Sequence, residues 1–107
     1  MQLKDLEAMG GVLSDAPVEK EIKFKLDGDT EHAATIYVKR LGLGEYERLM
    51  TGESVEWGTS ARIISEAITL GEKGKEKIPV QKAFRLHKGL AQAMLEAFKE
   101  VNGGKKG

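Results

Sequence analysis

The pattern of apolar and polar residues is that of β-strands between residues 18 and 39. Apolar side chains alternate there with charged or polar ones, in two runs centred on Phe24 and Ile36. Residues 27–30, between the two runs, have the Asp and Gly content of a tight turn. The pattern therefore predicts an antiparallel hairpin. Because two strands alone are marginal in water, we expect helices to cover its apolar face.

The helical period follows the hairpin and predicts three helices. Thr59 or Ser60 caps the second by accepting a backbone N–H, and Gly71 ends it. Pro79 suits the first position of the third. The three helices are expected at residues 45–50, 59–70 and 79–101, with a solvated, mobile loop at residues 71–77.

The apolar side chains of the third predicted helix fill an unusually wide face. Leu86, Ala93 and Ala97 widen the stripe to an arc of about 200°, whereas a surface helix needs ~100°. Two alternatives stay open: the helix is unusually buried in the monomer, or a second copy or another protein covers part of it. Gly89 costs about 1 kcal/mol relative to alanine in a helix and permits a local kink.

Residues 1–17 precede the predicted hairpin and are acidic. Leu3, Leu6 and Met9 have helical spacing, but the two glycines that follow end any helix within two or three turns, and an isolated helix that short is marginal in water. We predict a flexible acidic N-terminal arm over residues 1–17, with an arm that docks on a partner as the alternative.

The 107 residues are enough for one domain. Residues 18–102 are predicted to form a single α+β domain, in which an antiparallel hairpin packs against about three helices and the C-terminal helix is long. Residues 103–107 are predicted to be a flexible basic tail.

Composition limits the classes of function. The 17 Lys and Arg residues balance the 17 Asp and Glu residues, so a generally cationic binder of nucleic acid or membrane is not expected. The absence of cysteine excludes disulfides, thiolate metal sites and a cysteine nucleophile. No apolar run approaches the roughly 20 residues of a membrane span, and the first residues do not resemble a secretory signal. We therefore expect a cytoplasmic protein.

The charges are unevenly distributed. Residues 1–21 have a net charge of −3 and residues 71–88 a net charge of +4. Lys82, Arg85 and Lys88 lie in the first half of the third predicted helix, where the helix dipole disfavours cations. Recognition of an acidic surface, such as the N-terminal region of a neighbouring copy, explains this placement; a solvated helix face is the alternative.

The candidate partner-binding residues combine these cations with apolar neighbours and one aromatic residue. A loop tryptophan is a common interface anchor, although it can equally fold back onto the core. The candidates are Lys82, Arg85, Leu86, Lys88, Ala93, Ala97 and Trp57.

Patterns typical of catalysis or metal binding are missing. Neither His32 nor His87 has a second ligand at metal-binding spacing, and for His87 we expect a neutral, hydrogen-bonded core histidine. The carboxylates of residues 27–31 are too few for a calcium loop. Residues 42–44 lack the third glycine of a dinucleotide loop. The basic stretch at residues 75–88 lacks interleaved aromatic residues. We therefore predict no enzyme activity, no cofactor, no metal and no specific binding of nucleic acid.

Four short motifs carry a resemblance to a known family. They are IKFKL at residues 22–26, YVKRL at residues 37–41, GEYE at residues 44–47 and FKEVN at residues 98–102. With the order of the predicted elements, they resemble the tail assembly chaperones of long-tailed phages, small proteins encoded just before the tape measure protein. The similarity extends over residues 18–102. Residues 103–107 are Gly and Lys, whose codons can be written with G and A alone, and genes of this family often contain a ribosomal slippage site in such a run.

The resemblance implies a non-enzymatic role. Such a chaperone binds the tape measure protein, keeps it soluble and helps to recruit tail tube subunits. It acts in the host cytoplasm and is absent from the mature virion. We also expect a homo-oligomer. The alternatives are another small head–tail or virion accessory protein and a small nucleic-acid-binding regulator.

Overall fold

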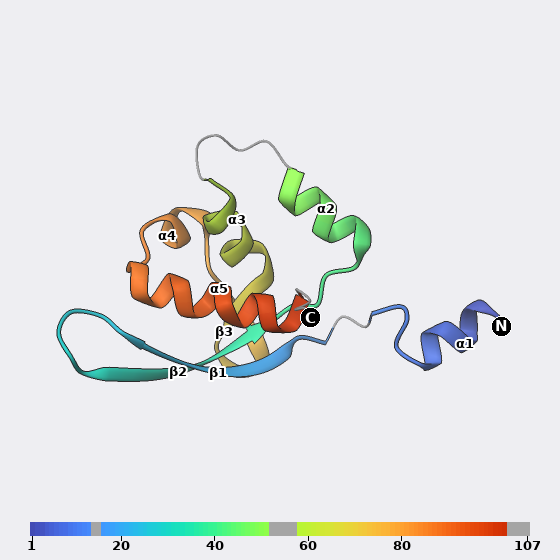
Figure 1. Ribbon diagram of the computed structural model, residues 1–107, viewed down its shortest axis with the longest axis horizontal. Coiled ribbons are helices and arrows are strands. Elements are labelled where there is room, and N and C mark those ends of the chain that lie inside the picture. Colours follow the sequence, from blue (N-terminus) through green and yellow to red (C-terminus); the bar gives the residue numbers. More distant parts are fainter. Residues whose placement is uncertain (14–15, 52–57, 103–107) are drawn as a thin grey trace.

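The computed structural model describes residues 1–13, 16–51 and 58–102 (Figure 1). In these residues a four-stranded antiparallel sheet, in the order β1-β2-β3-β4, has the helices α2 to α5 gathered on one side of β1 and β2. The elements are α1 (Leu3–Ala8), β1 (Val18–Lys25), β2 (Glu31–Val38), α2 (Leu43–Thr51), α3 (Gly58–Ala67), β3 (Ile68–Leu70), η1 (Glu72–Gly74), β4 (Glu76–Lys77), α4 (Val80–Phe84) and α5 (Lys88–Asn102).

The predicted hairpin is confirmed as β1 and β2. The two strands pair in antiparallel register over their full length, with Ile22 opposite Ala34. Ile22, Ile36 and Val38 are buried, whereas the alternate residues Glu19 and Glu21 are exposed. The period of two therefore places the apolar face under the helices, as half-buried strands require.

The second predicted helix is too long at its C-terminal end. α3 ends at Ala67, and Ile68–Leu70 forms β3, in which Ile68 lies opposite Val38 and is fully buried. The N–H of Lys39 donates to the carbonyl of Ala67 at 2.7 Å, which joins the end of β2 to the end of α3. The predicted mobile loop after Gly71 is also corrected, because it contains the turn η1 and the strand β4, which pairs with β3.

The prediction of one continuous helix over residues 79–101 is wrong, because α4 ends at Phe84 and α5 begins at Lys88. His87 caps α5: its carbonyl accepts the N–H of Ala91 at 2.9 Å, and its Nδ1 accepts the N–H of Gly89 at 3.0 Å. A Cβ on Gly89 would lie 2.6 Å from the carbonyl oxygen of Lys25. The start of α5 therefore lies directly against the end of β1.

His87 itself is not a core residue. Its side chain is 39% exposed, and its Nε2 lies 3.5 Å from Oδ1 of Asp27 in the hairpin turn. The expected burial is wrong, because the helix break brings His87 to the surface as a capping residue. The expected hydrogen bond is present, with the N–H of Gly89 as its donor.

The helices and the sheet share one hydrophobic core. Met94, Ala97 and Phe98 of α5 are buried in the same cluster as Ile64 of α3 and Ile36 of β2. Within residues 80–101 only Phe84, at 55%, is an exposed large apolar side chain, and the other large apolar side chains there are buried or half-buried. Of the two alternatives left open for this region, burial within the monomer is the one that the structure has. The predicted α+β class is confirmed.

Candidate interaction surfaces

The predicted partner-binding residues do not share one helix face. Lys82 lies in α4, and Lys88 begins α5; both are exposed, as is Arg85 between the two helices. Leu86 is half-buried in the same connection. Trp57 lies outside the described residues.

Ala93 and Ala97 face the sheet instead of this connection. They line a groove of about 180 Å³ between β1 and α5, where Ala93 is half-buried and Ala97 is 3% exposed. At the end of this groove, Nζ of Lys20 lies 2.8 Å from Oε1 of Glu100. The small alanine side chains allow α5 to lie close to β1.

An exposed aromatic residue lies close in sequence to the three cations. Phe84, the last residue of α4, is 55% exposed and lies in sequence between Lys82 and Arg85. We call Lys82, Phe84, Arg85 and Lys88 the α4 patch. The sequence placed Phe84 in a continuous apolar stripe, and the exposure of Phe84 could not be predicted without the helix break that follows it.

The described part of the N-terminal arm forms a short helix that is capped at both ends. At its start the N–H of Gln2 donates to Oδ2 of Asp5 at 2.8 Å, one half of a capping box. At its end the N–H of Gly11 donates to the carbonyl of Leu6 at 2.6 Å, and Gly10 has a φ of +88°. This is the Schellman arrangement, which glycine adopts without strain. The helical spacing and the glycine stop are thus confirmed, and they define α1.

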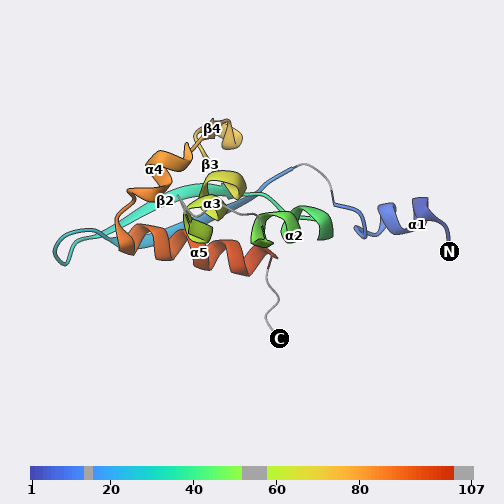
Figure 2. The same cartoon turned by 90° about the horizontal axis from the view of Figure 1, so that it is seen from above.

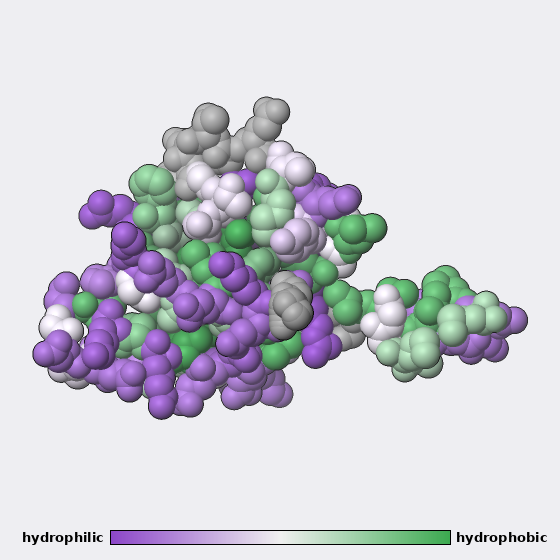
Figure 3. Space-filling view, in the orientation of Figure 1, coloured by the Kyte–Doolittle hydropathy of each residue, from purple (hydrophilic) through white to green (hydrophobic). Residues whose placement is uncertain are grey.

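The arm also carries most of the large apolar side chains that are exposed in the described part of the chain. Ten large apolar side chains are exposed among the described residues, and six of them belong to residues 1–13. No residue of α1 is buried, and Figures 1 and 2 show it projecting from the body. Figure 3 shows the hydrophobic surface along this projection. The six are Met1, Leu3, Leu6, Met9, Val12 and Leu13.

A groove of about 410 Å³ lies between α2, α3 and the start of α4. Its apolar lining comes from Leu41, Leu49 and Val80, and its charged lining includes Arg48 and Glu66. Pockets that hold small ligands fall in this size range, and a few apolar side chains of a protein partner need similar room. We call it the α2 groove.

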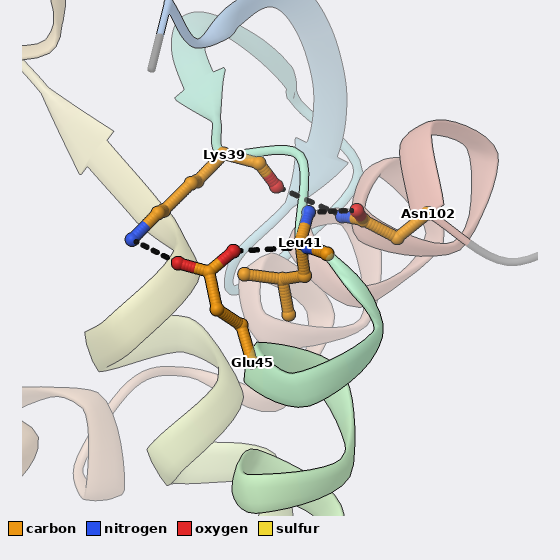
Figure 4. Close-up of polar contacts among 5 residues, drawn as sticks. Lys39, Leu41, Glu45 and Asn102 are labelled. Carbon is orange, nitrogen blue, oxygen red and sulfur yellow. Dashed lines mark hydrogen bonds and ion pairs between the residues drawn. The ribbon is translucent and has the colours of Figure 1, made fainter. Parts of the chain in front are cut away.

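One edge of the α2 groove is held by a polar network that joins three elements (Figure 4). Asn102, at the end of α5, accepts the N–H of Leu41 at 2.7 Å and donates to the carbonyl of Lys39 at 2.9 Å. Glu45 of α2 accepts the N–H of Gly42 at 2.9 Å and pairs with Nζ of Lys39 at 3.3 Å. The network fixes the β2–α2 connection to the end of α5.

Glu45 predicts a pH dependence of stability. The hydrogen bond from Gly42, followed by Lys39, lowers the pKa of this carboxyl below its ordinary value of 4.5. Because the folded state favours the carboxylate, its contribution is present above pH 4.5 and is lost as the pH falls through the lower folded-state pKa. In thermal unfolding, the wild type should therefore lose more stability than Glu45→Gln on acidification from neutral pH. Glu47→Gln, on the same helix, is the control for removal of one charge; equal responses of the two variants contradict the prediction.

Among the described residues, no group of three or more His, Asp or Glu side chains is placed to hold a metal ion, and no helix is long and apolar enough to cross a membrane. The candidate interaction surfaces of the described residues include the arm, the α4 patch and the two grooves.

Comparison with known proteins found one family. The family model described as "Phage tail assembly chaperone, TAC" matches residues 4–102. The matched region extends from α1 to the end of α5, so it includes most of the arm as well as the α+β body. No curated protein and no solved structure matches the chain.

Proposed function

Because the chain belongs to the phage tail assembly chaperone family, we propose that it binds the tape measure protein, keeps this long client soluble and helps to recruit tail tube subunits around it. The observation that carries the proposal is the family match over residues 4–102, nearly the whole chain. The role is non-enzymatic, takes place in the host cytoplasm and leaves the protein outside the mature virion.

The α2 groove is the proposed contact for the client. Its apolar lining, Leu41, Leu49 and Val80, suits the apolar face of an amphipathic helix, and its charged lining suits the polar flanks of such a helix. One groove of this size buries little area, so each contact is weak. Many copies bound along one client strengthen the complex, because tethered neighbours raise the effective concentration.

Co-expression with the tape measure protein tests this function. We expect the wild-type chain to raise the soluble fraction of the client several-fold, and the resulting complex to retain tail tube protein in a pull-down. A head–tail connector would leave the client aggregated, so an unchanged soluble fraction contradicts the proposal.

A groove variant locates the contact. Arg48→Glu combined with Glu66→Lys reverses two charges of the groove lining without changing net charge, and we expect it to lower the soluble fraction of the client. The matched control, Lys23→Glu with Glu31→Arg, makes the same exchange at exposed positions of the hairpin. If both variants support the client equally, the α2 groove is not the contact.

A further inference from the structure

α2 carries apolar side chains on a side that the other described residues leave open. The helix lies at the edge of the body, beside α3 (Figure 1). Leu43, Tyr46 and Met50 are three and four residues apart, so they lie on one side of α2 over two turns. Leu43 is 78% exposed, Tyr46 is 39% exposed and Met50 is half-buried. We call these three residues the α2 stripe.

The α2 stripe and the α2 groove lie on different sides of the same helix. Glu45, Arg48 and Leu49 of α2 line the groove. Since successive residues of a helix are about 100° apart, Arg48 lies roughly opposite Met50. Leu49, the buried residue of α2, anchors the helix in the core between the two sides. A partner that fills the groove therefore leaves the α2 stripe uncovered.

The spacing of the α2 stripe fits another helix. Apolar residues at positions i, i+3 and i+7 form a seam against which a second amphipathic helix packs. From Leu43 to Met50 this seam extends about 10 Å along α2, since each residue of a helix rises about 1.5 Å. A partner helix of roughly three turns is enough to cover it.

An acidic side chain borders the α2 stripe. Glu47 lies about 40° from Leu43 around the helix and is exposed. Among the described residues, no cation forms an ion pair with its carboxylate. Charges at the rim of an interface help to decide which partners bind. The α2 stripe therefore favours an amphipathic helix that has a lysine or arginine beside its apolar residues.

The client of the proposed function can supply such a helix from close by. A client segment that is held in the α2 groove keeps the neighbouring segments of the same client near α2. Their effective concentration at the α2 stripe exceeds that of a partner that must bind from solution. A second copy of the chain or a tail tube subunit is therefore at a disadvantage as the occupant.

On the basis of the proposed function, we propose that the α2 stripe binds a second amphipathic helical segment of the tape measure protein, so that α2 lies between two helices of one client. Leu43 and Tyr46 pack against the apolar side chains of that segment, and Glu47 pairs with a cation at its flank. Each client helix then meets α2 in place of another client helix. This separation keeps the apolar stripes of the client from associating with one another.

Photo-crosslinking identifies the molecule that lies on the α2 stripe. The full chain with Leu43→p-benzoylphenylalanine is co-expressed with the tape measure protein and the tail tube protein, and the cells are irradiated. We expect a crosslink to the tape measure protein. Arg48→p-benzoylphenylalanine, on the groove side of α2, should crosslink to a different segment of the same client, which mass spectrometry of the crosslinked peptides locates. Leu26→p-benzoylphenylalanine, at an exposed leucine of the hairpin turn, is the control and should not reach the client.

Leu43→Ser with Tyr46→Ser tests whether the contact contributes to binding. Both side chains are exposed, so the variant should fold as the wild type does, which circular dichroism verifies. With the tape measure protein immobilised on a sensor surface, we expect binding about tenfold weaker than that of the wild type. In the co-expression, the soluble fraction of the client should fall several-fold. Leu26→Ser is the matched control and should behave as the wild type does.

Any of three results overturns the proposal. The first is a crosslink from position 43 that is absent, or that joins a second copy or the tail tube protein instead of the client. The second is that positions 43 and 48 crosslink to the same client segment, and the third is a serine variant that binds the client as the wild type does. Failure of the proposed function is recognised separately, because it appears as an unchanged soluble fraction of the client with the wild type.

Discussion

Replacement of Gly74 by alanine should lower the free energy of unfolding by about 2–4 kcal/mol. Gly74 ends the turn η1 with a φ of +75°, a conformation that strains an L-residue. Its new Cβ would lie 2.6 Å from Oγ1 of Thr69 and 2.9 Å from Cβ of Tyr37. These residues belong to β3 and β2, so the methyl group would push η1 away from the sheet. Chemical denaturation measures the loss.

Gly28→Ala separates the backbone strain of a positive φ from the steric clash of the new methyl group. Gly28 also has a positive φ, +93°, but its Cβ would have no atom within 4 Å. Gly28→Ala should therefore lower the free energy of unfolding by the backbone strain alone, about 1–2 kcal/mol. Equal losses at the two positions would mean that Gly74 does not approach the sheet as described.

The local patterns of the chain were sufficient to predict the hairpin and the first body helix. The alternation around Phe24 and Ile36 has a single interpretation, because only a strand places such residues on one face. The start of α2 depends on Gly42 and Glu45, which are neighbours in the sequence. Each of these elements is specified by residues within itself, and each was predicted correctly.

The elements that were missed depend on contacts between distant residues. Ile68 and Leu70 fit the apolar face of a helix as well as that of a strand. The pairing of Ile68 with Val38 of β2 and of Leu70 with Glu76 of β4 decides for the strand. The apolar stripe continues across the helix break before Lys88, and only Gly89 indicated that a kink was allowed there. The close approach beside the break joins residues more than 60 positions apart, because a Cβ on Gly89 would lie 2.6 Å from the carbonyl oxygen of Lys25.

The candidate surfaces show the same difference between what nearby residues determine and what contacts between distant residues determine. Charge alone selected Lys82, Arg85 and Lys88, and all three are exposed. The expected excess of apolar surface was placed on residues 80–101, whereas six of the ten large apolar side chains exposed in residues 1–13, 16–51 and 58–102 lie in the arm. The width of an apolar stripe shows how much a helix must bury but not what covers it, and here β1, β2 and α3 supply the cover.

Gly89→Ala tests the joint between α5 and β1. Alanine normally stabilises a helix relative to glycine by about 1 kcal/mol. At Gly89 the added Cβ would lie 2.6 Å from the carbonyl oxygen of Lys25, which is backbone and cannot rotate away. The clash outweighs the gain in propensity, so we expect a net loss of about 1–3 kcal/mol, the usual cost of overpacking. In thermal unfolding, each kcal/mol lowers Tm by roughly 4–8 °C for a domain near this size.

Gly44→Ala is a closely matched control for this substitution. Gly44 follows the capping residue Gly42 by two positions in α2, just as Gly89 follows His87 in α5. A Cβ on Gly44 would meet no atom within 4 Å. The same substitution at the same helix position should therefore stabilise the protein by about 0.5–1 kcal/mol at Gly44 and destabilise it at Gly89. Opposite signs would show that contact with Lys25, and not helix propensity, determines the effect of the substitution at Gly89; a gain at both positions would remove that explanation.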